Sequence, residues 1–367
     1  MTKLLPFLFA GFMGLIAARA QAEPQVWQGR IGSAPIVMEL GSDSADHAAR
    51  YFYRKYNIDI LLAVEKTESG KLSLTGSEAN ERMVLIQKGK GWEGQWQGPE
   101  GKKLPVTLEP LDLSTIKIKY PLDNMSYYDI AKAAGMRLKA GKKEKFMGHT
   151  IEWMEEPTTK INMFRVRDGF PDKTLARINA VLEERQRREI YTYFDCVMNM
   201  NGGTYDQKVT PRFLNARFLS VSIFTDYYCG DAHPDFGDNP LNLNIENGKF
   251  LELEDFLWVG TGEPQSFPAG DWTLKNIEYW TDIRSPWLLK TLTRLYPKEM
   301  EDPPEGTGCD YSDAEIWKFV TMYLTPQGIY VGPVFPRAAR VCEWPEWSIL
   351  PWGVVNKHPG KLKGNLP

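Results

Sequence analysis

The sequence of 367 residues has few histidines, few cysteines and no excess of either charge. It has four histidines and four cysteines, and its 44 Lys and Arg residues nearly balance its 47 Asp and Glu residues, for a formal net charge of −3. Such a chain lacks the cationic surface that binds nucleic acid or anionic membranes without specificity. A composition of 43% hydrophobic and 25% charged residues is typical of a globular protein, which excludes disordered and collagen-like classes.

The sequence also lacks the common catalytic motifs. It contains no G-x-S-x-G nucleophile elbow, no H-E-x-x-H zinc motif and no phosphate-binding P-loop. Ser114 and Lys117 fit the S-x-x-K pattern, but the companion S-D-N and K-T-G motifs are missing, and the alternating Thr and Ile residues here predict a strand. We therefore expect neither a cofactor nor a metal ion.

The first 22 residues have the parts of a secretory signal peptide. Lys3 supplies the positive start, and Leu4 to Ala17 form an apolar stretch that is too short to span a bilayer comfortably. Ala20-Gln21-Ala22 is an A-x-A cleavage site, and no later stretch has the apolar length of a membrane helix. A buried N-terminal helix is the alternative, but a polar, strand-like pattern follows at once from Glu23. We predict that residues 1–22 are a signal peptide and that the protein is periplasmic or secreted, without stable membrane insertion.

The four cysteines indicate a disulfide framework, because an even number in an exported chain predicts two disulfides. Three connectivities are possible, and we prefer Cys196–Cys229 with Cys309–Cys342 because each pair joins neighbouring segments. On the loop-entropy model each disulfide would stabilise the fold by roughly 3–4 kcal/mol. A zinc site needs close C-x-x-C pairs, which the sequence does not contain; four buried free thiols are the remaining alternative.

Residues 23–110 have the pattern of an all-β domain. Short apolar runs alternate with turn residues, at a spacing typical of an antiparallel sandwich or a small barrel. The expected strands are Val26–Ile31, Ile36–Leu40, Tyr51–Tyr56, Ile58–Val64, Lys71–Thr75, Met83–Gln87, Trp92–Trp96 and Val106–Leu108.

A W-x-G pattern occurs three times in this region, beginning at Trp27, Trp92 and Trp96. We interpret each Trp as a core residue and each Gly as a bulge or a close approach of two strands. An exposed Trp platform that stacks against carbohydrate is the alternative.

Residues 111–355 have the mixed pattern of an α+β domain. Asp172 is a suitable N-cap for a helix that ends near Arg188, where three arginines would complement the C-terminal end. Ser285-Pro286 begins a second helix, and the alternation from Leu219 to Ile223 predicts a half-buried strand. The predicted fold class is therefore α+β: an N-terminal all-β sandwich or small barrel, then an α/β domain with a mostly antiparallel sheet and two or three helices.

Two hairpins are expected in this second domain. They pair Leu241–Ile245 with Lys249–Leu253 and Phe319–Leu324 with Gly328–Phe335. In the first, a three-residue loop with Gly248 in the left-handed region pairs Leu243 with Leu251, whereas a two-residue loop sets Leu243 opposite a glutamate. We prefer the first register because it keeps the apolar face together. The basic residues 137–143 predict a solvated hairpin tip, and residues 356–367 predict a loose tail.

A dense polar segment, Asp231–Asp238, follows the aromatic pair Tyr227-Tyr228. Asp231, His233 and Asp235 alternate as calcium-loop ligands do, but glycine is at the seventh position and asparagine at the twelfth, so the calcium loop is not matched. We favour a turn in which His233 is buried and bonded to backbone groups, so that its loss destabilises the protein more than it changes any activity. The candidate binding residues are Tyr227, Tyr228, Asp231, His233 and Asp235.

The order of segments over about residues 160–355 resembles that of a known family. Phe218–Ser222 leads to Tyr227-Tyr228, and Gly230 to Pro234 follow with G-D-A-H where the family has G-G-A-H. The further matching segments are Leu241–Ile245, Asn247-Gly248-Lys249, Leu253–Phe256 and Tyr323–Tyr330. The chain is thus similar to the domain of unknown function shared by lysozyme-sensing anti-sigma-factor ectodomains and some membrane-anchored polysaccharide deacetylases. The resemblance implies an α/β fold with a small sheet, no enzymatic activity, and binding of protein or cell-wall material.

Two functional classes follow. The first is an exported, non-catalytic binding or envelope-sensing protein that recognises a lysozyme-like protein or peptidoglycan. Eight of the twelve Trp residues lie between Trp258 and Trp352 and provide candidates for a recognition face. The alternative is a cell-wall polymer hydrolase with His233 as general base and Asp231 or Asp235 as its partner, which requires His233 in an open cleft.

Overall fold

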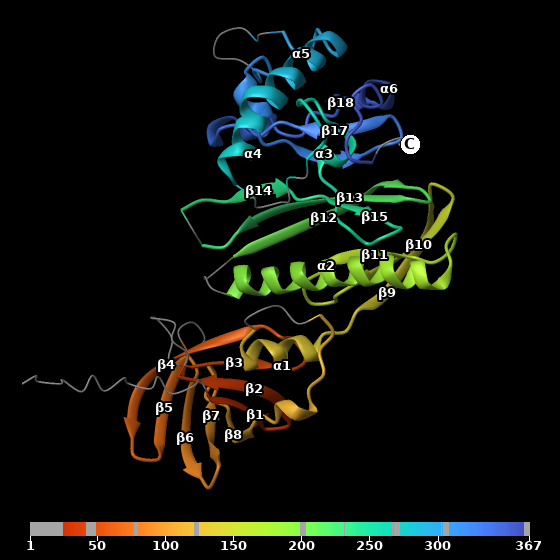
Figure 1. Cartoon of the computed structure of the whole chain (residues 1–367). Helices are drawn as coiled ribbons and strands as arrows, with labels where there is room; N and C mark the ends of the chain where they lie inside the picture. Colours follow the sequence, from red (N-terminus) through yellow and green to blue (C-terminus); the bar gives the residue numbers. More distant parts are fainter. Residues whose placement is uncertain are drawn as a thin grey trace, which may run out of the picture. The chain divides into compact units, whose positions relative to one another are not determined.

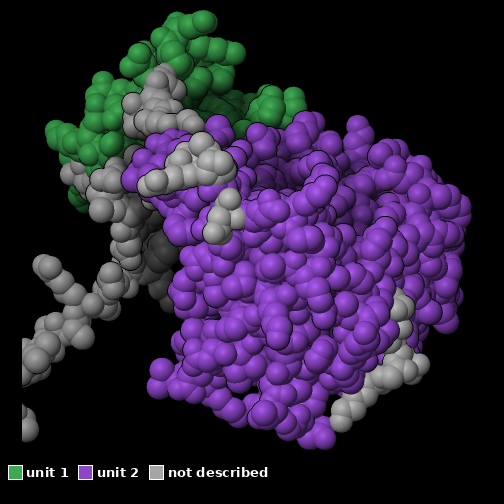
Figure 2. All heavy atoms as spheres, turned by 90° about the horizontal axis from the view of Figure 1, so that it is seen from above, with its two compact units in different colours: residues 1–117, 125–134 green, residues 118–124, 135–367 purple. Residues whose placement is uncertain are grey.

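The structure is a computed structural model that describes residues 25–41, 49–76, 80–120, 125–198, 203–230, 232–265, 267, 272–301, 303 and 308–362. The predicted signal peptide lies outside these residues. The chain forms two compact units, which Figure 2 distinguishes by colour. The barrel unit comprises residues 1–117 and 125–134, and the C-terminal unit comprises residues 118–124 and 135–367. Among the described helices, none combines the length and apolar character needed to cross a membrane.

The barrel unit contains a closed barrel of eight antiparallel strands that pair in sequence order (Figure 1). They are β1 (Gln25–Ile31), β2 (Ala34–Leu40), β3 (Ala49–Tyr53), β4 (Asp59–Glu68), β5 (Lys71–Gly76), β6 (Arg82–Lys88), β7 (Gly91–Gln97) and β8 (Lys103–Pro110), followed by the 3-10 helix η1 (Leu113–Thr115). All eight expected strands are confirmed. The pairing of β8 with β1 closes the sheet and decides between the barrel and the sandwich.

The W-x-G pattern contributes to the core of the barrel. Trp27 is buried, and Trp92 and Trp96 pack against the same cluster from partly buried positions. A Cβ atom on Gly29 would lie 1.9 Å from the carbonyl oxygen of Thr107 on β8, so only glycine fits between these strands. The core interpretation of the pattern is confirmed.

Helix α1 (Tyr127–Gly135) packs within the barrel unit, which therefore continues past the predicted boundary at residue 110. Tyr128 is fully buried, and its ring meets that of Phe52 edge-on with centroids 5.1 Å apart. Asp59 accepts hydrogen bonds from the Tyr128 hydroxyl and the Lys132 ammonium at 2.6 and 2.7 Å. Because Asp59 and Lys132 are both buried, their pairing removes the cost of burying either charge alone.

The described residues of the C-terminal unit form three antiparallel sheets, ordered β11-β10-β9, β12-β13-β14 with β15 also on β13, and β16-β17-β18. The strands are β9 (Lys139–Phe146), β10 (His149–Glu155), β11 (Asn162–Val166), β12 (Thr204–Leu214), β13 (Phe218–Tyr228), β14 (Asp235–Asp238), β15 (Leu241–Asn244), β16 (Thr321–Leu324), β17 (Gly328–Gly332) and β18 (Ile349–Pro351). The helices are α2 (Asp172–Met198), α3 (Leu253–Phe256), α4 (Leu274–Glu278), α5 (Ser285–Leu295) and α6 (Trp352–Val355), with the short η2 (Tyr279–Arg284), η3 (Ala314–Trp317) and η4 (Arg337–Cys342). The α+β layout is confirmed, but the described residues form three small sheets in place of one and five α-helices in place of two or three.

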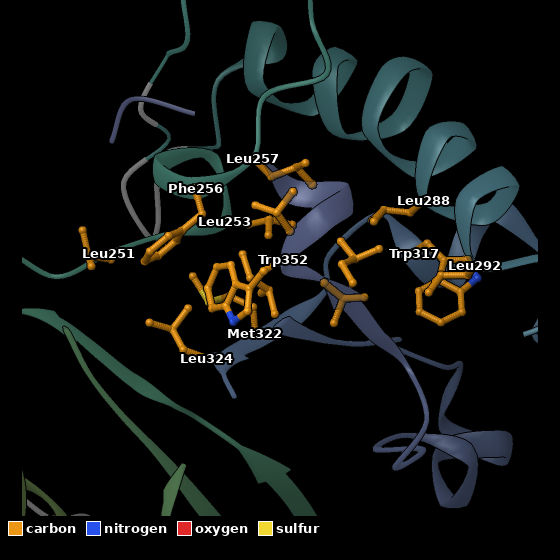
Figure 3. Close-up of a cluster of buried hydrophobic side chains, with 14 of the residues drawn as sticks. Leu251, Leu253, Phe256, Leu257, Leu288, Leu292, Trp317, Met322, Leu324 and Trp352 are labelled. Atoms are coloured by element: carbon orange, nitrogen blue, oxygen red, sulfur yellow. The ribbon is translucent and has the colours of Figure 1, made fainter. Parts of the chain in front are cut away.

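Two apolar clusters hold the sheets of this unit in place. One packs α2 against β10 and β11 and against β12 and β13. The other surrounds β16 and β17; Figure 3 shows Leu288 and Leu292 of α5 close to Trp317, and Phe256 beside Trp352. The predicted strand at residues 219–223 and the β16–β17 hairpin are confirmed as parts of this framework. The strand is buried on both faces rather than half-buried, because Ser220 accepts the N–H of Leu324 at 2.9 Å and Ser222 donates to Asp238 at 2.7 Å.

Helix α2 extends well past its predicted end near Arg188, to Met198. Ile190 and Phe194 are buried and continue the apolar stripe that sequence analysis ended too early. Arg188 lies inside the helix and pairs with Glu184 one turn earlier, rather than complementing the helix end.

The predicted register of the hairpin at residues 241–253 is wrong. Leu243 bridges Phe250 rather than Leu251. Asn244 accepts a hydrogen bond from a backbone N–H of the turn, and β15 pairs along its length with β13 as well as bonding to the returning chain. The side-chain cap and the neighbouring strand thus override the apolar pattern on which the prediction relied.

Three smaller expectations are also corrected. Ser114 lies in η1, where Asp112 accepts its N–H, and not in a strand. Most of residues 137–143 lie on the exposed edge strand β9, where lysines protect an unpaired edge, rather than at a hairpin tip. Residues 356–362 are not loose, because the N–H of Trp258 donates to a carbonyl oxygen in this segment at 2.9 Å.

Glu252, which precedes α3, provides a test of pH-dependent stability. Burial, reinforced by the charges of Glu254 and Asp255, raises the pKa of its carboxyl to about 7. The folded state therefore binds this proton more tightly than the unfolded chain, and the free energy of unfolding falls as the pH rises from the ordinary value of 4.5 through about 7. As the pH rises from about 5 to about 8, the free energy of unfolding of Glu252→Gln is expected to increase by about 2–3 kcal/mol relative to that of the wild type. Urea unfolding at both pH values measures this change, and a constant difference contradicts it.

Candidate functional site

The sequence-predicted candidates lie at the end of β13 and the start of β14. Tyr227 pairs with Asp235 across the two strands, and Tyr228 follows at the strand end. His233 is exposed in the turn between the strands, so the prediction of a buried histidine is wrong. The physical reason is that this turn projects beyond the last paired residues of β13 and β14. Asp231 lies outside the described residues.

Both preferred disulfides are present, Cys196–Cys229 and Cys309–Cys342. The first ties the last turns of α2 to the end of β13, and the second ties the segment before η3 to η4. Two disulfides fit a protein that is exported to an oxidising compartment.

Tyr227 and Asp235 line a cleft of about 490 Å³ between α2, β13 and β14, which we call the α2 cleft. Its charged groups are largely paired with one another. Arg185 donates to Glu189 at 2.5 Å, and Arg340 donates to Asp235. These ion pairs hold the charged side chains in place as part of the wall of the cleft.

A second cleft of about 580 Å³ lies between the β12-β13-β14 sheet and the β16-β17-β18 sheet, and we call it the tyrosine cleft. Its lining combines aromatic rings with charged groups, as binding sites for polar organic ligands do. It includes Lys208 and Arg212 of β12, Asp238 of β14, Tyr323 and Tyr330 of the β16–β17 hairpin, and Trp344.

Three side chains of the tyrosine cleft form a stack. The rings of Tyr323 and Tyr330 are parallel, with centroids 4.3 Å apart and an interplanar angle of 12°. The guanidinium carbon of Arg212 lies 4.5 Å from the centroid of the Tyr323 ring, in a cation–π contact. Burial raises the pKa of both tyrosines, so their hydroxyls stay protonated at neutral pH.

Asp238 lies at the border of the two clefts and lines both. Its carboxylate accepts hydrogen bonds from the Ser222 hydroxyl at 2.7 Å and from the Ile223 N–H at 2.8 Å. Burial raises the pKa of this carboxyl, although the hydrogen bonds and the nearby Arg212 act in the opposite direction. Asp238 is therefore held in one orientation between the clefts.

Trp344 has a backbone φ of +62°, which is unusual for a large aromatic residue. Its ring packs against Phe224 and Phe236, with centroids 5.1 and 5.5 Å away. The preceding Glu343 accepts the N–H of Phe335 at 3.0 Å, which fixes the backbone beside it. Backbone strain of this kind is concentrated at binding and catalytic sites. Here the strained residue places its indole in the lining of the tyrosine cleft.

No family model matches the sequence, and a search of the curated proteins finds no match either. The resemblance seen over residues 160–355 therefore stays a prediction. Within the described ranges, no three His, Cys, Asp or Glu side chains come together in a group that could hold a metal ion.

The sequence patterns do not reveal the tyrosine cleft as a site. The available signal is the predicted hairpin, in which Tyr323 and Tyr330 face each other across the two strands. The Trp-rich region from Trp258 to Trp352 contains Trp344, but four of its eight Trp residues are buried in the core. No sequence pattern marks Arg212 as a site residue, because the position of its side chain depends on how β12 pairs with β13.

Proposed function

We propose that the protein is an exported, non-catalytic binding protein of the cell envelope that recognises peptidoglycan through the tyrosine cleft. The composition of that cleft carries the proposal, with Trp344 and the Tyr323–Tyr330 stack beside Arg212. The partly buried indole of Trp344 offers an aromatic surface to the C–H groups of a sugar, while the charged side chains of the cleft bind hydroxyls and carboxylates.

Two further points support this proposal. The resemblance over residues 160–355 implies binding of protein or cell-wall material, and the two disulfides fit an exported chain. A glycan is favoured over lysozyme because a concave cleft of about 580 Å³ suits a few sugar units. A stable protein partner would instead need about 800 Å² of matched surface on each side.

The hydrolase alternative has less support from the geometry. His233 is exposed in a turn and lines neither the α2 cleft nor the tyrosine cleft. Asp235, its nearest described partner in sequence, is paired with Arg340. In this mechanism the carboxylate partner must orient the histidine that acts as general base. The carboxylate of Asp235 is instead paired with Arg340.

His233→Ala is expected to change the free energy of unfolding by no more than about 0.5 kcal/mol, because an exposed turn residue makes few contacts. Peptidoglycan binding is expected to stay unchanged as well. Thermal unfolding and cosedimentation measure the two effects. A loss of function at an unchanged melting temperature would restore the hydrolase assignment.

Cosedimentation of the full chain with purified peptidoglycan tests the proposed function. We expect the protein in the pellet, and we expect soluble peptidoglycan fragments to release it. Beads that carry lysozyme are the parallel test for a protein partner. Retention by lysozyme alone would assign the protein-binding class, and retention by neither material would overturn the proposal.

A further inference from the structure

Arg212 occupies a β-bulge in β12. Pro211 pairs with Val221 and Phe213 pairs with Ser220, so the regular register is interrupted at Arg212. A bulge inserts an extra residue into one strand and re-aims its side chain, and bulges are frequent next to active and binding sites. Here the Arg212 side chain lines the tyrosine cleft.

The guanidinium of Arg212 is stacked on a ring, whereas the arginines of the α2 cleft are salt-bridged. Arg185 and Arg340 pair with Glu189 and Asp235. The buried Nε of Arg212 has no hydrogen-bond partner within the described part of the chain. Stacking uses the face of the planar guanidinium, so its in-plane N–H groups remain available at the edge.

The other charged groups of the cleft restrict where an anion could bind. Lys208 lies four residues before Arg212 on β12 and adds a second positive charge to the lining. Asp238 and Glu346 also line the cleft, and their negative charges repel an anion from their own sides. The carboxylate of Asp238 is engaged by Ser222 and Ile223, which leaves the edge of Arg212 as the best-placed anion contact.

We infer that Arg212 anchors a carboxylate of the ligand, and that the tyrosine cleft therefore prefers a carboxylated sugar to a neutral one. This inference rests on the proposed function and names the ligand class. A guanidinium binds a carboxylate through two parallel hydrogen bonds, a geometry that neutral hydroxyls do not reproduce. In peptidoglycan, the lactyl ether of N-acetylmuramic acid carries such a carboxylate wherever no stem peptide is attached to it, whereas N-acetylglucosamine carries none.

Calorimetric titration of the full chain with two matched probes tests the inference. The probes are the disaccharide of N-acetylglucosamine and N-acetylmuramic acid, and the same disaccharide with its carboxylate converted to an amide. The wild type is expected to bind the acid at least about 10-fold more tightly than the amide. Arg212→Gln is expected to lose this preference while it binds the amide as the wild type does.

Two further variants separate anchoring from folding. Arg212→Lys keeps the charge but not the planar fork, and it is expected to retain only part of the preference. Arg188→Gln changes an exposed arginine of α2 that lines neither cleft, and it is expected to behave as the wild type. Melting temperatures of all three variants show that each is folded.

Each contrary result has a separate meaning. Equal binding of acid and amide by the wild type, or an undiminished preference in Arg212→Gln, would overturn the inference and leave the proposed function standing. Retention on peptidoglycan without binding of either disaccharide would overturn the inference as well. Failure to bind peptidoglycan itself would overturn both.

Discussion

Trp344→Ala is expected to weaken peptidoglycan binding at least about 30-fold, because an aromatic ring in a cleft of this kind is the typical binding hot spot. The indole lines the tyrosine cleft and is held there by Phe224 and Phe236. Alanine removes the stacking face but leaves the charged groups of the cleft in place. Equilibrium binding to soluble peptidoglycan fragments measures the effect.

The matched control for this variant is Trp272→Ala. Trp272 is 61% exposed, belongs to the same unit and contacts Trp280 and Phe319 rather than the cleft. We expect it to bind as the wild type does, and we expect Trp344→Phe to recover most of the lost affinity because it restores an aromatic face. Equal losses in the two alanine variants would show that the tyrosine cleft is not the binding site.

Removal of the Cys309–Cys342 disulfide, as Cys309→Ser with Cys342→Ser, is expected to lower the free energy of unfolding by roughly 3–4 kcal/mol. The loss arises because the unfolded chain regains the freedom that the closed loop removes. Cys342 lies two residues before Trp344, so we expect ligand affinity to fall as well. Urea unfolding without reductant and a binding titration measure the two effects.

The other disulfide supplies a control of equal loop size, since both disulfides join residues separated by 33 positions. Loop entropy therefore predicts similar losses of stability for the two double serine variants. Cys196–Cys229 borders the α2 cleft rather than the tyrosine cleft, so its removal is expected to leave peptidoglycan affinity unchanged. An equal loss of affinity in both would indicate a general loosening of the unit rather than a local role for Cys342.

Local order in the chain could be predicted well from the sequence. The eight barrel strands follow from alternating apolar residues between turn residues, and this pattern is set by neighbours a few positions apart. The close approach at Gly29 has the same origin, because a glycine after a core Trp in a strand marks a site without room for a side chain. The preferred disulfides could also be predicted locally, since each joins segments that follow closely along the chain.

Features that depend on pairing between distant segments could not be predicted in this way. The register at Leu243 and the exposure of His233 both follow from how neighbouring elements pair, and sequence patterns alone misplaced them. The candidate site has the same character. Tyr323 meets Arg212 only because two separate sheets face each other across the cleft.

The sequence by itself thus determined where the barrel strands lie, which residues are apolar, and which pairing of the cysteines is preferred. The tertiary structure alone decided that β8 closes on β1, and that a bulge presents Arg212 beside Tyr323 and Tyr330. The physical reason is that periodicity and turn preference act over a few residues, whereas closure, bulging and stacking depend on the free energy of the whole folded unit.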